Sequence, residues 1–488
     1  MAAVVRAFRL GSQSLWADEI LTWHSVQLGL PMDLSRWLEN VHGPLYGLLL
    51  HGWIALAGDS EWALRAPSLV FGVALVPTTA WFAARWLEPR AAVPAAWLAA
   101  GAPYLVWYSQ EARNYSLLML CSAAAALGLV ALRERLRPTP LLVTLAASCA
   151  GVLSNFSFAL LLPAQLRMAL ASPRERVARW IGIAVLVVAL GLVAWPWASR
   201  VTTTFDFARL VPGRTLAAGE TPLRGATTFH AAAIPFGLHS LAMGYSFGPP
   251  LRALRADHSL AALRPFAVEV TCAALVFGAL TVLGLRAVAR RGRALDALLW
   301  IGVPLLVISY FALQNFKVFH PRYLAVVMPV LVALWAAALT DLRGRARLAF
   351  AVAIVALWAV SLTRLYADPR YAKEDLRDAA QFVERERGPA EIVIAANTTD
   401  MLAYYFRDRV AVEHYWLGFA RDQVTMRERF EALRSGRAAW VVMTRPEELD
   451  PSGRFAIDLA MRYPDSEQRG FEGVRVWHLP ASITTTAP

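Results

Sequence analysis

The sequence predicts a mainly α-helical polytopic membrane protein with a small α/β domain at its C-terminal end. Of its 488 residues, 57% are hydrophobic and only 17% are charged, which is too apolar for a soluble chain of this length. The apolar residues fall into runs of about 20, the length that crosses a bilayer. After Asp368 the composition becomes that of a soluble domain. Together these observations predict about ten or eleven transmembrane helices followed by an extramembrane domain.

Ten apolar runs have the length and composition of membrane spans. They are residues 66–86, 91–108, 114–132, 138–154, 155–171, 179–199, 266–286, 296–315, 322–340 and 347–366. Met1–Leu10 is also apolar, but it is too short to cross a bilayer or to act as a secretory signal. We expect it to be the end of a first span that starts before Met1, and the alternative is a short interfacial segment.

Positive charge is distributed unevenly among the connections between these runs. One alternating set of short connections holds 16 arginines, whereas the other holds only Arg113, Lys317 and Arg322. The positive-inside rule places the arginine-rich set in the cytoplasm, where anionic lipid headgroups are its expected partners. The net charge of +12 is therefore read as a sign of membrane topology and not of nucleic-acid binding. Asp18, Glu111 and the C-terminal region are then expected on the extracytoplasmic side.

Two domains are expected from this division. Residues 1–366 form the transmembrane domain, and residues 367–488 form a soluble extracytoplasmic α/β domain. Within the first, residues 11–64 are an extracytoplasmic loop with interfacial helices, because the apolar run 45–57 is too short to span. Residues 200–265 are a second, long extracytoplasmic loop, which would be a substrate lid, an acceptor channel or passive cover.

The soluble tail shows alternating strand and helix patterns. Strands are predicted at 391–396, 438–443 and 474–479. Helices are predicted at 373–387, 400–407 and 422–435.

Five polar motifs stand at the extracytoplasmic ends of the predicted spans. They are Leu10–Glu19 (LGSQSLWADE), His42–Tyr46 (HGPLY), Ser60–Ser68 (SEWALRAPS), Ser109–Tyr115 (SQEARNY) and His320–Leu324 (HPRYL). In this order, over about residues 10–366, they resemble the motifs of bacterial glycosyltransferase family 39 in the GT-C superfamily. That group includes protein O-mannosyltransferases and the lipid A aminoarabinose transferase. One position departs from the family, because Gly43 stands where a proline is common; this loosens the backbone after His42.

The resemblance implies an integral membrane enzyme of the bacterial cell (inner) membrane with its site on the extracytoplasmic face. It implies a sugar donor linked to polyprenyl or dolichyl phosphate and an acceptor hydroxyl on a lipid, a glycan or a protein. It leaves the sugar open, because mannose, arabinose and galactose all fit. The absence of Gly-x-Gly-x-x-Gly, Walker and Asp-x-Asp motifs also favours a lipid-phosphate donor over a nucleotide sugar.

Asp18, Glu19 and Glu111 are the candidate catalytic residues. Asp18 and Glu19 are adjacent, so on a helix they point about 100° apart and cannot act on the same atom. We expect Asp18 to be the general base, partly on the family resemblance, and Glu19 to hold a partner. The alternative for Asp18 is a carboxylate that interacts with a helix dipole. The alternative for Glu111 is a local ion pair with Arg113.

Lys317, His320, Arg322 and Arg113 are the candidate ligands of the donor phosphate. Fixed cations stabilise the negative charge that develops on a departing phosphate, and arginine can hold a phosphate with two hydrogen bonds. The alternative is that these side chains extend toward lipid headgroups.

His42, Tyr115 and Tyr323 are expected to contact the donor or the acceptor, although a single histidine is more often structural. No cofactor is indicated with certainty. A divalent cation, Mg²⁺ or Mn²⁺, held by Asp18 or Glu111 is compatible with carboxylate, water and phosphate ligands. The three cysteines lie in apolar runs and are expected to be buried hydrophobic residues.

Two other classes of function stay open. A transporter or flippase of lipid-linked sugars would carry its ionisable residues near the middle of the membrane, whereas those singled out here lie at one face. A non-catalytic membrane scaffold would have no need of an acidic first loop.

Overall fold

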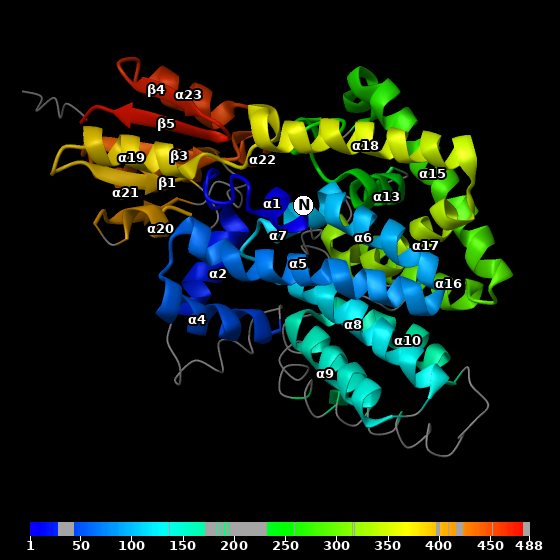
Figure 1. Cartoon of the computed structure of the whole chain (residues 1–488). Coiled ribbons are helices and arrows are strands. Elements are labelled where there is room, and N and C mark those ends of the chain that lie inside the picture. The colour runs from blue at the N-terminus through cyan, green and yellow to red at the C-terminus, as the bar shows by residue number, and fades with distance from the viewer. Residues whose placement is uncertain are drawn as a thin grey trace, which may run out of the picture. The chain divides into compact units, whose positions relative to one another are not determined.

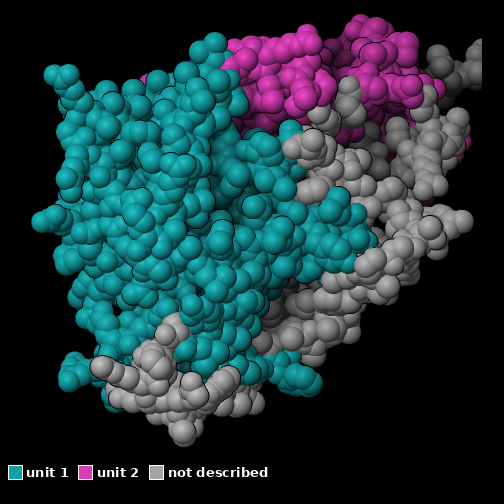
Figure 2. Space-filling model, turned by 90° about the vertical axis from the view of Figure 1, so that its right-hand side faces the viewer, with its two compact units in different colours: residues 1–8, 28–247, 268–362 teal, residues 9–27, 248–267, 363–488 magenta. Residues whose placement is uncertain are grey.

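The computed structural model (Figure 1) forms two compact units, which Figure 2 shows in different colours. The first comprises residues 1–8, 28–247 and 268–362, and the second comprises residues 9–27, 248–267 and 363–488. The structure describes residues 1–27, 43–135, 137–170, 183, 187, 190–191, 195, 232–257, 259–314, 316, 318–396, 401–407, 409–415, 423–450 and 452–481.

The first unit is helical. Its elements are α1 (Ala2–Ala7), α4 (Leu45–Ala57), α5 (Glu61–Trp86), η1 (Pro89–Ala91), α6 (Ala92–Gly101), α7 (Pro103–Ser109), α8 (Tyr115–Glu134), α9 (Pro138–Ser154), η2 (Phe156–Leu161), α10 (Leu162–Leu170), α13 (Ala233–Met243), α15 (Ala267–Arg290), α16 (Ala294–Leu313), η5 (Pro321–Val327), α17 (Met328–Asp341) and α18 (Gly344–Ala367). The last residues of α18, from Thr363, belong to the second unit.

In the part of the chain that the structure describes, six helical segments are long and apolar enough to cross a membrane. They are Glu61–Trp86, Tyr115–Glu134, Leu260–Arg290, Ala294–Leu313, Pro321–Asp341 and Gly344–Ala367. Shorter apolar helices occur at Leu45–Ala57, Pro138–Ser154, Phe156–Leu170 and Ala233–Met243. The predicted fold class is confirmed, whereas the number of ten or eleven spans stays a prediction. Most of the predicted span 179–199 lies outside the described residues.

The predicted span 91–108 is not one continuous helix. It divides into α6 and α7 at Ala102, whose backbone is extended (φ −57°, ψ 118°). Pro103 explains the break, because proline disfavours helical geometry in the residue before it. Proline is also well tolerated at the first position of a new helix, which is where α7 begins.

Small residues let the long helices approach one another closely, as is common in membrane proteins. A Cβ atom added to Gly284 of α15 would lie 2.3 Å from the carbonyl oxygen of Leu334 in α17. One added to Gly128 of α8 would lie 2.4 Å from Oγ1 of Thr144 in α9. The segment Pro321–Asp341, which joins η5 and α17, is the most enclosed of the six and is 94% buried. It is therefore a central element of this unit.

The second unit contains a five-stranded mixed sheet with the order β2-β1-β3-β5-β4. The strands are β1 (Ile392–Ala395), β2 (Val412–His414), β3 (Ala439–Thr444), β4 (Glu467–Phe471) and β5 (Val474–Leu479). β1 pairs in parallel with β2 and β3, whereas β5 pairs antiparallel with β3 and β4. The three strands predicted from the sequence are β1, β3 and β5.

Helices of the second unit are mostly short. They are α2 (Ala17–Gln27), α14 (Leu251–Ala256), η4 (Leu260–Phe266), η6 (Pro369–Tyr371), α19 (Leu376–Glu386), α20 (Ala403–Phe406), α21 (Gln423–Arg434), α22 (Pro446–Leu449) and α23 (Arg454–Arg462). One face of the sheet packs Val441 and Trp477 against Phe430 of α21 and Phe455 of α23. Helix α19 packs against β3 and β5, with its Phe382 edge-on to Trp440.

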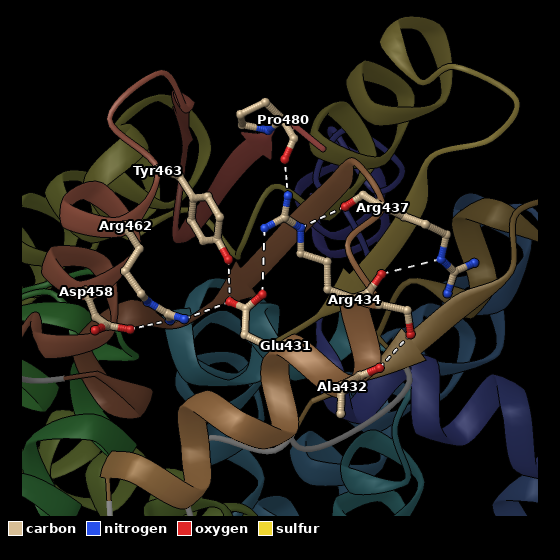
Figure 3. Close-up of polar contacts among 9 residues, drawn as sticks. Glu431, Ala432, Arg434, Arg437, Asp458, Arg462, Tyr463 and Pro480 are labelled. Atoms are coloured by element: carbon tan, nitrogen blue, oxygen red, sulfur yellow. Dashed lines mark hydrogen bonds and ion pairs between the residues drawn. The ribbon is translucent and has the colours of Figure 1, made fainter. Parts of the chain in front are cut away.

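A polar cluster ties α21 to α23 and to the chain after β5 (Figure 3). Glu431 of α21 accepts hydrogen bonds from Arg462 and from the hydroxyl of Tyr463. Arg434 is fully buried and donates to the carbonyl oxygens of Arg437 and Pro480. The guanidinium of Arg434 also lies 4.4 Å from the ring centre of Tyr463. These contacts, with an ion pair between Arg434 and Glu431 at 3.8 Å, offset part of the cost of removing this charge from water.

Candidate active site

The first-loop motif that contains Asp18 is held by the C-terminal part of the second unit. Ser14 Oγ donates to Oδ1 of Asp375 at 3.0 Å and accepts from the backbone N–H of Arg377 at 3.1 Å. The N–H of Leu15 donates to the hydroxyl of Tyr405 at 2.7 Å. The motif is therefore fixed by residues that lie more than 350 positions further along the chain.

The two adjacent carboxylates occupy the first turn of α2, but their surroundings differ. Glu19 is fully buried, and its Oε2 atom lies 3.1 Å from Nζ of Lys373. The N–H of Trp16 also donates to Glu19 Oε2 at 3.4 Å, in the manner of a helix cap. Asp18 is only partly buried. Glu19 thus has a partner in Lys373, and the catalytic roles of the two carboxylates stay a prediction.

Arg445, at the start of α22, lies beside this turn. Its guanidinium is 5.6 Å from the ring centre of Trp16, and its Nε donates to Oε1 of Glu374 at 2.6 Å. Burial lowers the pKa of Arg445, but the carboxylates of Glu374, Glu448 and Asp18 outweigh this effect and the net shift is upward. Arg445 is therefore charged and interacts electrostatically with Asp18.

Glu374 is the centre of a buried ion-pair network. Besides Arg445, it binds Nη1 of Arg255 at 3.3 Å. Burial raises the pKa of Glu374, yet the charges of Arg445 and Arg255 and a backbone hydrogen bond outweigh it and lower the pKa to about 2. The carboxylate is thus ionised at every physiological pH.

The first unit holds another group of the predicted site residues, on the turn between α7 and α8. Glu111 and Arg113 are buried there, and the N–H of Arg113 donates to the carbonyl of Glu111 at 2.7 Å. Trp107 Nε1 donates to Oε1 of Glu111 at 2.7 Å. Tyr115, the first residue of α8, is fully buried, and its ring lies 4.8 Å from that of Tyr108.

Hydrogen bonds to neighbouring elements hold this turn in place. Ser68 of α5 donates to the carbonyl of Arg113 at 3.0 Å, and Asn114 Nδ2 donates to the carbonyl of Ser154 at 2.5 Å. The buried Arg6 of α1 donates to Ser109 Oγ at 3.1 Å, at the end of α7. Such bonds hold Glu111 in one position, as a functional side chain requires.

The HPRYL segment lies next to the same turn. Tyr104 of α7 donates to the carbonyl of Pro321 at 3.0 Å. Tyr245, which follows α13, shares a 2.8 Å hydrogen bond with Tyr108, and its ring lies 6.1 Å from that of His320. Nδ1 of His320 accepts from the N–H of Arg322 at 3.1 Å and so caps η5.

Electrostatic effects on Tyr245 also link the two segments. Burial raises the pKa of Tyr245 most, the charge of Glu111 raises it further, and the charge of Arg322 lowers it. Arg322 in turn lies over the ring of Tyr323, 5.4 Å from its centre. The first unit thus brings together six predicted residues: Glu111, Arg113, Tyr115, His320, Arg322 and Tyr323.

The remaining predicted site residues do not belong to the described part of the first unit. Asp18 and Glu19 belong to the second unit, and His42 and Lys317 lie outside the described residues. Gly43 is described, and a Cβ atom there would lie 2.0 Å from the carbonyl oxygen of Leu153. A close approach of α9 thus explains the departure from the family motif more directly than a loosened backbone does.

Four side chains of these two regions were missed by the sequence interpretation: Trp107, Tyr245, Lys373 and Arg445. One signal could have found Lys373, because it is one of only two lysines in the chain. Arg445 could not be found in this way, because it is one arginine among many in a segment of ordinary polar composition. Among the described residues, no group of three or more His, Cys, Asp or Glu side chains could hold a metal ion.

Residues 41–197 match the family model described as dolichyl-phosphate-mannose-protein mannosyltransferase. No curated protein sequence matches the chain. The solved structure of ArnT from Cupriavidus metallidurans bound to undecaprenyl phosphate matches with a TM-score of 0.61 and 15% identity, over 100% of this chain and 97% of that one. The apo form of ArnT gives a TM-score of 0.57 and 15% identity, over 97% and 95% of the two chains.

A third solved structure is the oligosaccharyltransferase of Archaeoglobus fulgidus in complex with Zn and sulfate. It matches with a TM-score of 0.51 and 12% identity, over 94% of this chain and 69% of that one. At these identities the matches establish the fold. The protein is therefore a multi-pass membrane protein with the fold of the GT-C glycosyltransferases, and its segment 41–197 matches the dolichyl-phosphate-mannose-protein mannosyltransferase family.

Proposed function

We propose that the protein is a glycosyltransferase that moves a sugar from a polyprenyl-phosphate donor to an acceptor hydroxyl on the extracytoplasmic side of the bacterial inner membrane. The sugar is a hexose or a pentose, and its anomeric centre is inverted. The similarity of fold to ArnT, whose solved structure holds undecaprenyl phosphate, supports the lipid carrier. The family match over residues 41–197 supports the transfer of a sugar from a lipid phosphate.

The observation that carries the proposal is the difference between Asp18 and Glu19. Glu19 is neutralised by Lys373 in a buried pair, so it is not available to accept a proton. Asp18 is partly exposed at the start of α2, and its charge acts on Arg445. An accessible carboxylate can act as a general base.

In the proposed reaction Asp18 accepts the proton of the acceptor hydroxyl. The acceptor oxygen forms a bond to the anomeric carbon of the donor sugar, and the bond from that carbon to the phosphate oxygen breaks. The electron pair of the broken bond leaves with the polyprenyl phosphate. A single displacement of this kind inverts the anomeric centre.

We assign the binding of the departing phosphate to the cations of the first unit. Arg322 and His320 stand next to Tyr245 on η5 and its preceding loop, and Arg113 stands on the turn with Glu111. Lys317, outside the described residues, belongs to the same segment of sequence. Fixed cations here would stabilise the charge that develops on the phosphate. Glu111, held by Trp107, would orient Arg113.

The test is transfer by the Asp18→Asn variant. In a strain that lacks the protein, mass spectrometry of envelope glycans and glycoproteins identifies the missing product, and plasmid-borne variants are then scored for its return. We expect Asp18→Asn to restore less than about one hundredth of the product, because removal of a general base costs about 10²–10⁴ in rate. The matched control is Asp465→Asn, at an exposed aspartate of the C-terminal domain, which should restore transfer fully.

Near-normal product from a membrane-inserted Asp18→Asn protein would contradict the assignment of the base. The same strain also separates the alternative of a flippase. A flippase mutant would accumulate lipid-linked sugar on the cytoplasmic side, whereas a transferase mutant would accumulate it on the extracytoplasmic side.

A further inference from the structure

Arg445 has an unusual backbone conformation for a residue with a side chain. Its φ and ψ angles are 51° and 56°, in the left-handed region, where a residue other than glycine is strained by about 1 kcal/mol. Its N–H donates to the carbonyl of Gly473 at 2.9 Å, which holds the backbone in place. Strain of this kind persists where the surrounding structure imposes it, and it is often found at functional sites.

The side chain of Arg445 uses only part of its hydrogen-bonding capacity. Nε donates to Glu374, and Nη1 lies 3.7 Å from Oε2 of Glu448. The guanidinium lies over the ring of Trp16, 5.6 Å from its centre. Nη2 is buried and has no hydrogen-bond partner among the residues that the structure describes. A buried donor without a partner is costly, so a ligand is the natural explanation.

The side chain of Trp16 provides a second buried donor without a hydrogen-bond partner. Its indole Nε1 is buried and lacks a hydrogen-bond partner within the described part of the chain. Trp16 stands two positions before Asp18, at the start of α2. Both donors belong to the second unit and to residues near the carboxylate that we propose as the base: Trp16 precedes Asp18 by two positions, and the charge of Asp18 acts on Arg445.

We propose that Trp16 Nε1 and Arg445 Nη2 form a subsite that binds a polyhydroxylated, sugar-like group next to Asp18. This inference rests on the proposed function, because it takes Asp18 as the reactive carboxylate. The subsite combines two donors with a carboxylate acceptor. A hydroxyl group can accept from the donors and also donate to Asp18.

The negative charges around the subsite disfavour the binding of an anion such as phosphate. Arg445 is already paired with Glu374, and Glu374, Glu448 and Asp18 all act on it as negative charges. A phosphate placed here would be repelled by Asp18, whereas a neutral sugar hydroxyl would not. The subsite at Trp16 is therefore suited to hydroxyl groups and not to a phosphate.

The sugar-like group can come from two sources, the transferred sugar of the donor or a glycan acceptor. The full-length protein is labelled with 5-fluorotryptophan and purified in detergent, and fluorine NMR then reports on its 18 tryptophans. The Trp16→Phe variant identifies the Trp16 resonance by its disappearance. The probes are free mannose, galactose and arabinose, undecaprenyl phosphate, and undecaprenyl-phosphate mannose.

We expect at least one sugar-bearing probe to move the Trp16 resonance, and undecaprenyl phosphate alone to leave it in place. A shift that needs undecaprenyl-phosphate mannose identifies the donor sugar. A shift caused by a free sugar, and unaffected by saturating undecaprenyl phosphate, identifies the acceptor side.

Three variants separate binding from structure. Arg445→Gln should raise the sugar concentration for half-maximal shift about tenfold, the equivalent of one charge-assisted hydrogen bond. If Arg445→Gln does not fold, Arg445→Lys replaces it in this test. Because lysine keeps the positive charge, Arg445→Lys should weaken sugar binding less than Arg445→Gln. Glu374→Gln removes the ion pair but keeps the guanidinium, so it should leave the shift intact.

The proposal is overturned if no sugar-bearing probe moves the Trp16 resonance, or if undecaprenyl phosphate alone moves it. It is also overturned if Glu374→Gln weakens sugar binding as much as Arg445→Gln does, because Arg445 would then act only through its ion pair. These readouts measure binding, so they stand independently of the transfer activity that tests the role of Asp18.

Discussion

At the scale of single residues, the neighbours Asp18 and Glu19 differ through contacts that come from the far end of the chain. Lys373 neutralises Glu19, whereas Asp18 is left partly exposed near the charge of Arg445. Their chemistry is otherwise similar, with ordinary pKa values of about 3.9 and 4.3. The roles of the two carboxylates thus depend on their environment and not on residue type.

Lys373→Met should destabilise the folded protein by about 3–5 kcal/mol, because it leaves the fully buried carboxylate of Glu19 without its counter-charge. Thermal unfolding in detergent, followed by intrinsic fluorescence, measures the loss. The double variant Lys373→Met/Glu19→Gln removes both charges and should recover most of it. If Lys373→Met unfolds at the same temperature as the wild type, the ion pair contributes little to the stability of the fold.

The lowered pKa of Glu374 predicts that the stability of the folded protein depends on pH. Its pKa falls from an ordinary value of 4.5 to about 2 on folding, so its contribution to stability is full above about pH 4.5. That contribution is lost as the pH falls toward 2, and it amounts to about 3 kcal/mol.

The measurement is the unfolding midpoint of the wild type and of Glu374→Gln over this pH range. Other carboxylates titrate in both proteins, so the difference between the two curves isolates Glu374. The midpoint of the wild type should fall more steeply with acid than that of the variant, and parallel curves would refute the assignment.

At the scale of elements, two local breaks shape the region around Glu111. Pro103 separates α6 from α7, and so places Trp107 and Tyr108 on a short helix that ends just before the Glu111 turn. Gly43 lets the start of α4 lie directly against the backbone of α9. Both residues act through steric effects: proline restricts the residue before it, and glycine lacks a side chain.

Gly43→Ala should destabilise the protein by about 1–3 kcal/mol, because its Cβ atom would collide with the backbone carbonyl of Leu153, which cannot turn aside as a side chain can. The matched control is Gly52→Ala in the same region, on α4, where a Cβ atom meets nothing within 4 Å. That change should be neutral or stabilise by up to about 1 kcal/mol through helix propensity. Thermal unfolding of both variants tests the difference, and equal midpoints would argue against the close contact.

At the scale of the whole molecule, the chain folds into two compact units whose boundaries do not follow the sequence. The first-loop segment 9–27 and the segment 248–267 belong to the same unit as the C-terminal sheet. Arg252 and Arg255 of the second segment pair with Glu472 and Glu374 respectively. Three distant parts of the chain thus build one unit.

The distribution of arginine predicts that the C-terminal sheet domain is extracytoplasmic. Alkaline phosphatase, which is active only outside the cytoplasm, should be active when it is fused after Leu479. It should be inactive when it is fused after Arg135, in an arginine-rich connection. The opposite pattern would reverse the proposed orientation of the membrane domain and of Asp18.

Much of the fold was predictable because its signals are local. The apolar runs that became α5, α8, α15, α16, α17 and α18, and the strands β1, β3 and β5, each carry their own pattern of hydrophobic residues. The candidate site was predictable where a motif marked it, as for Glu111 and Arg322. Arg445 and Tyr245 were not predictable, because their proximity to the motifs arises only from folding, and Lys373 was marked only by the rarity of lysine in this chain.

The sequence by itself determined that the protein is a helical membrane protein with a C-terminal α/β domain, and it selected Asp18 and Glu111 as the acidic residues of interest. Hydrophobic length and charge asymmetry are local properties, and each can be read from a single stretch of chain. Only the tertiary structure decided that Glu19 is neutralised by Lys373, and that Arg445 lies over the ring of Trp16, each with a buried donor that has no partner in the described part of the chain. Such contacts join residues hundreds of positions apart, so no local pattern records them.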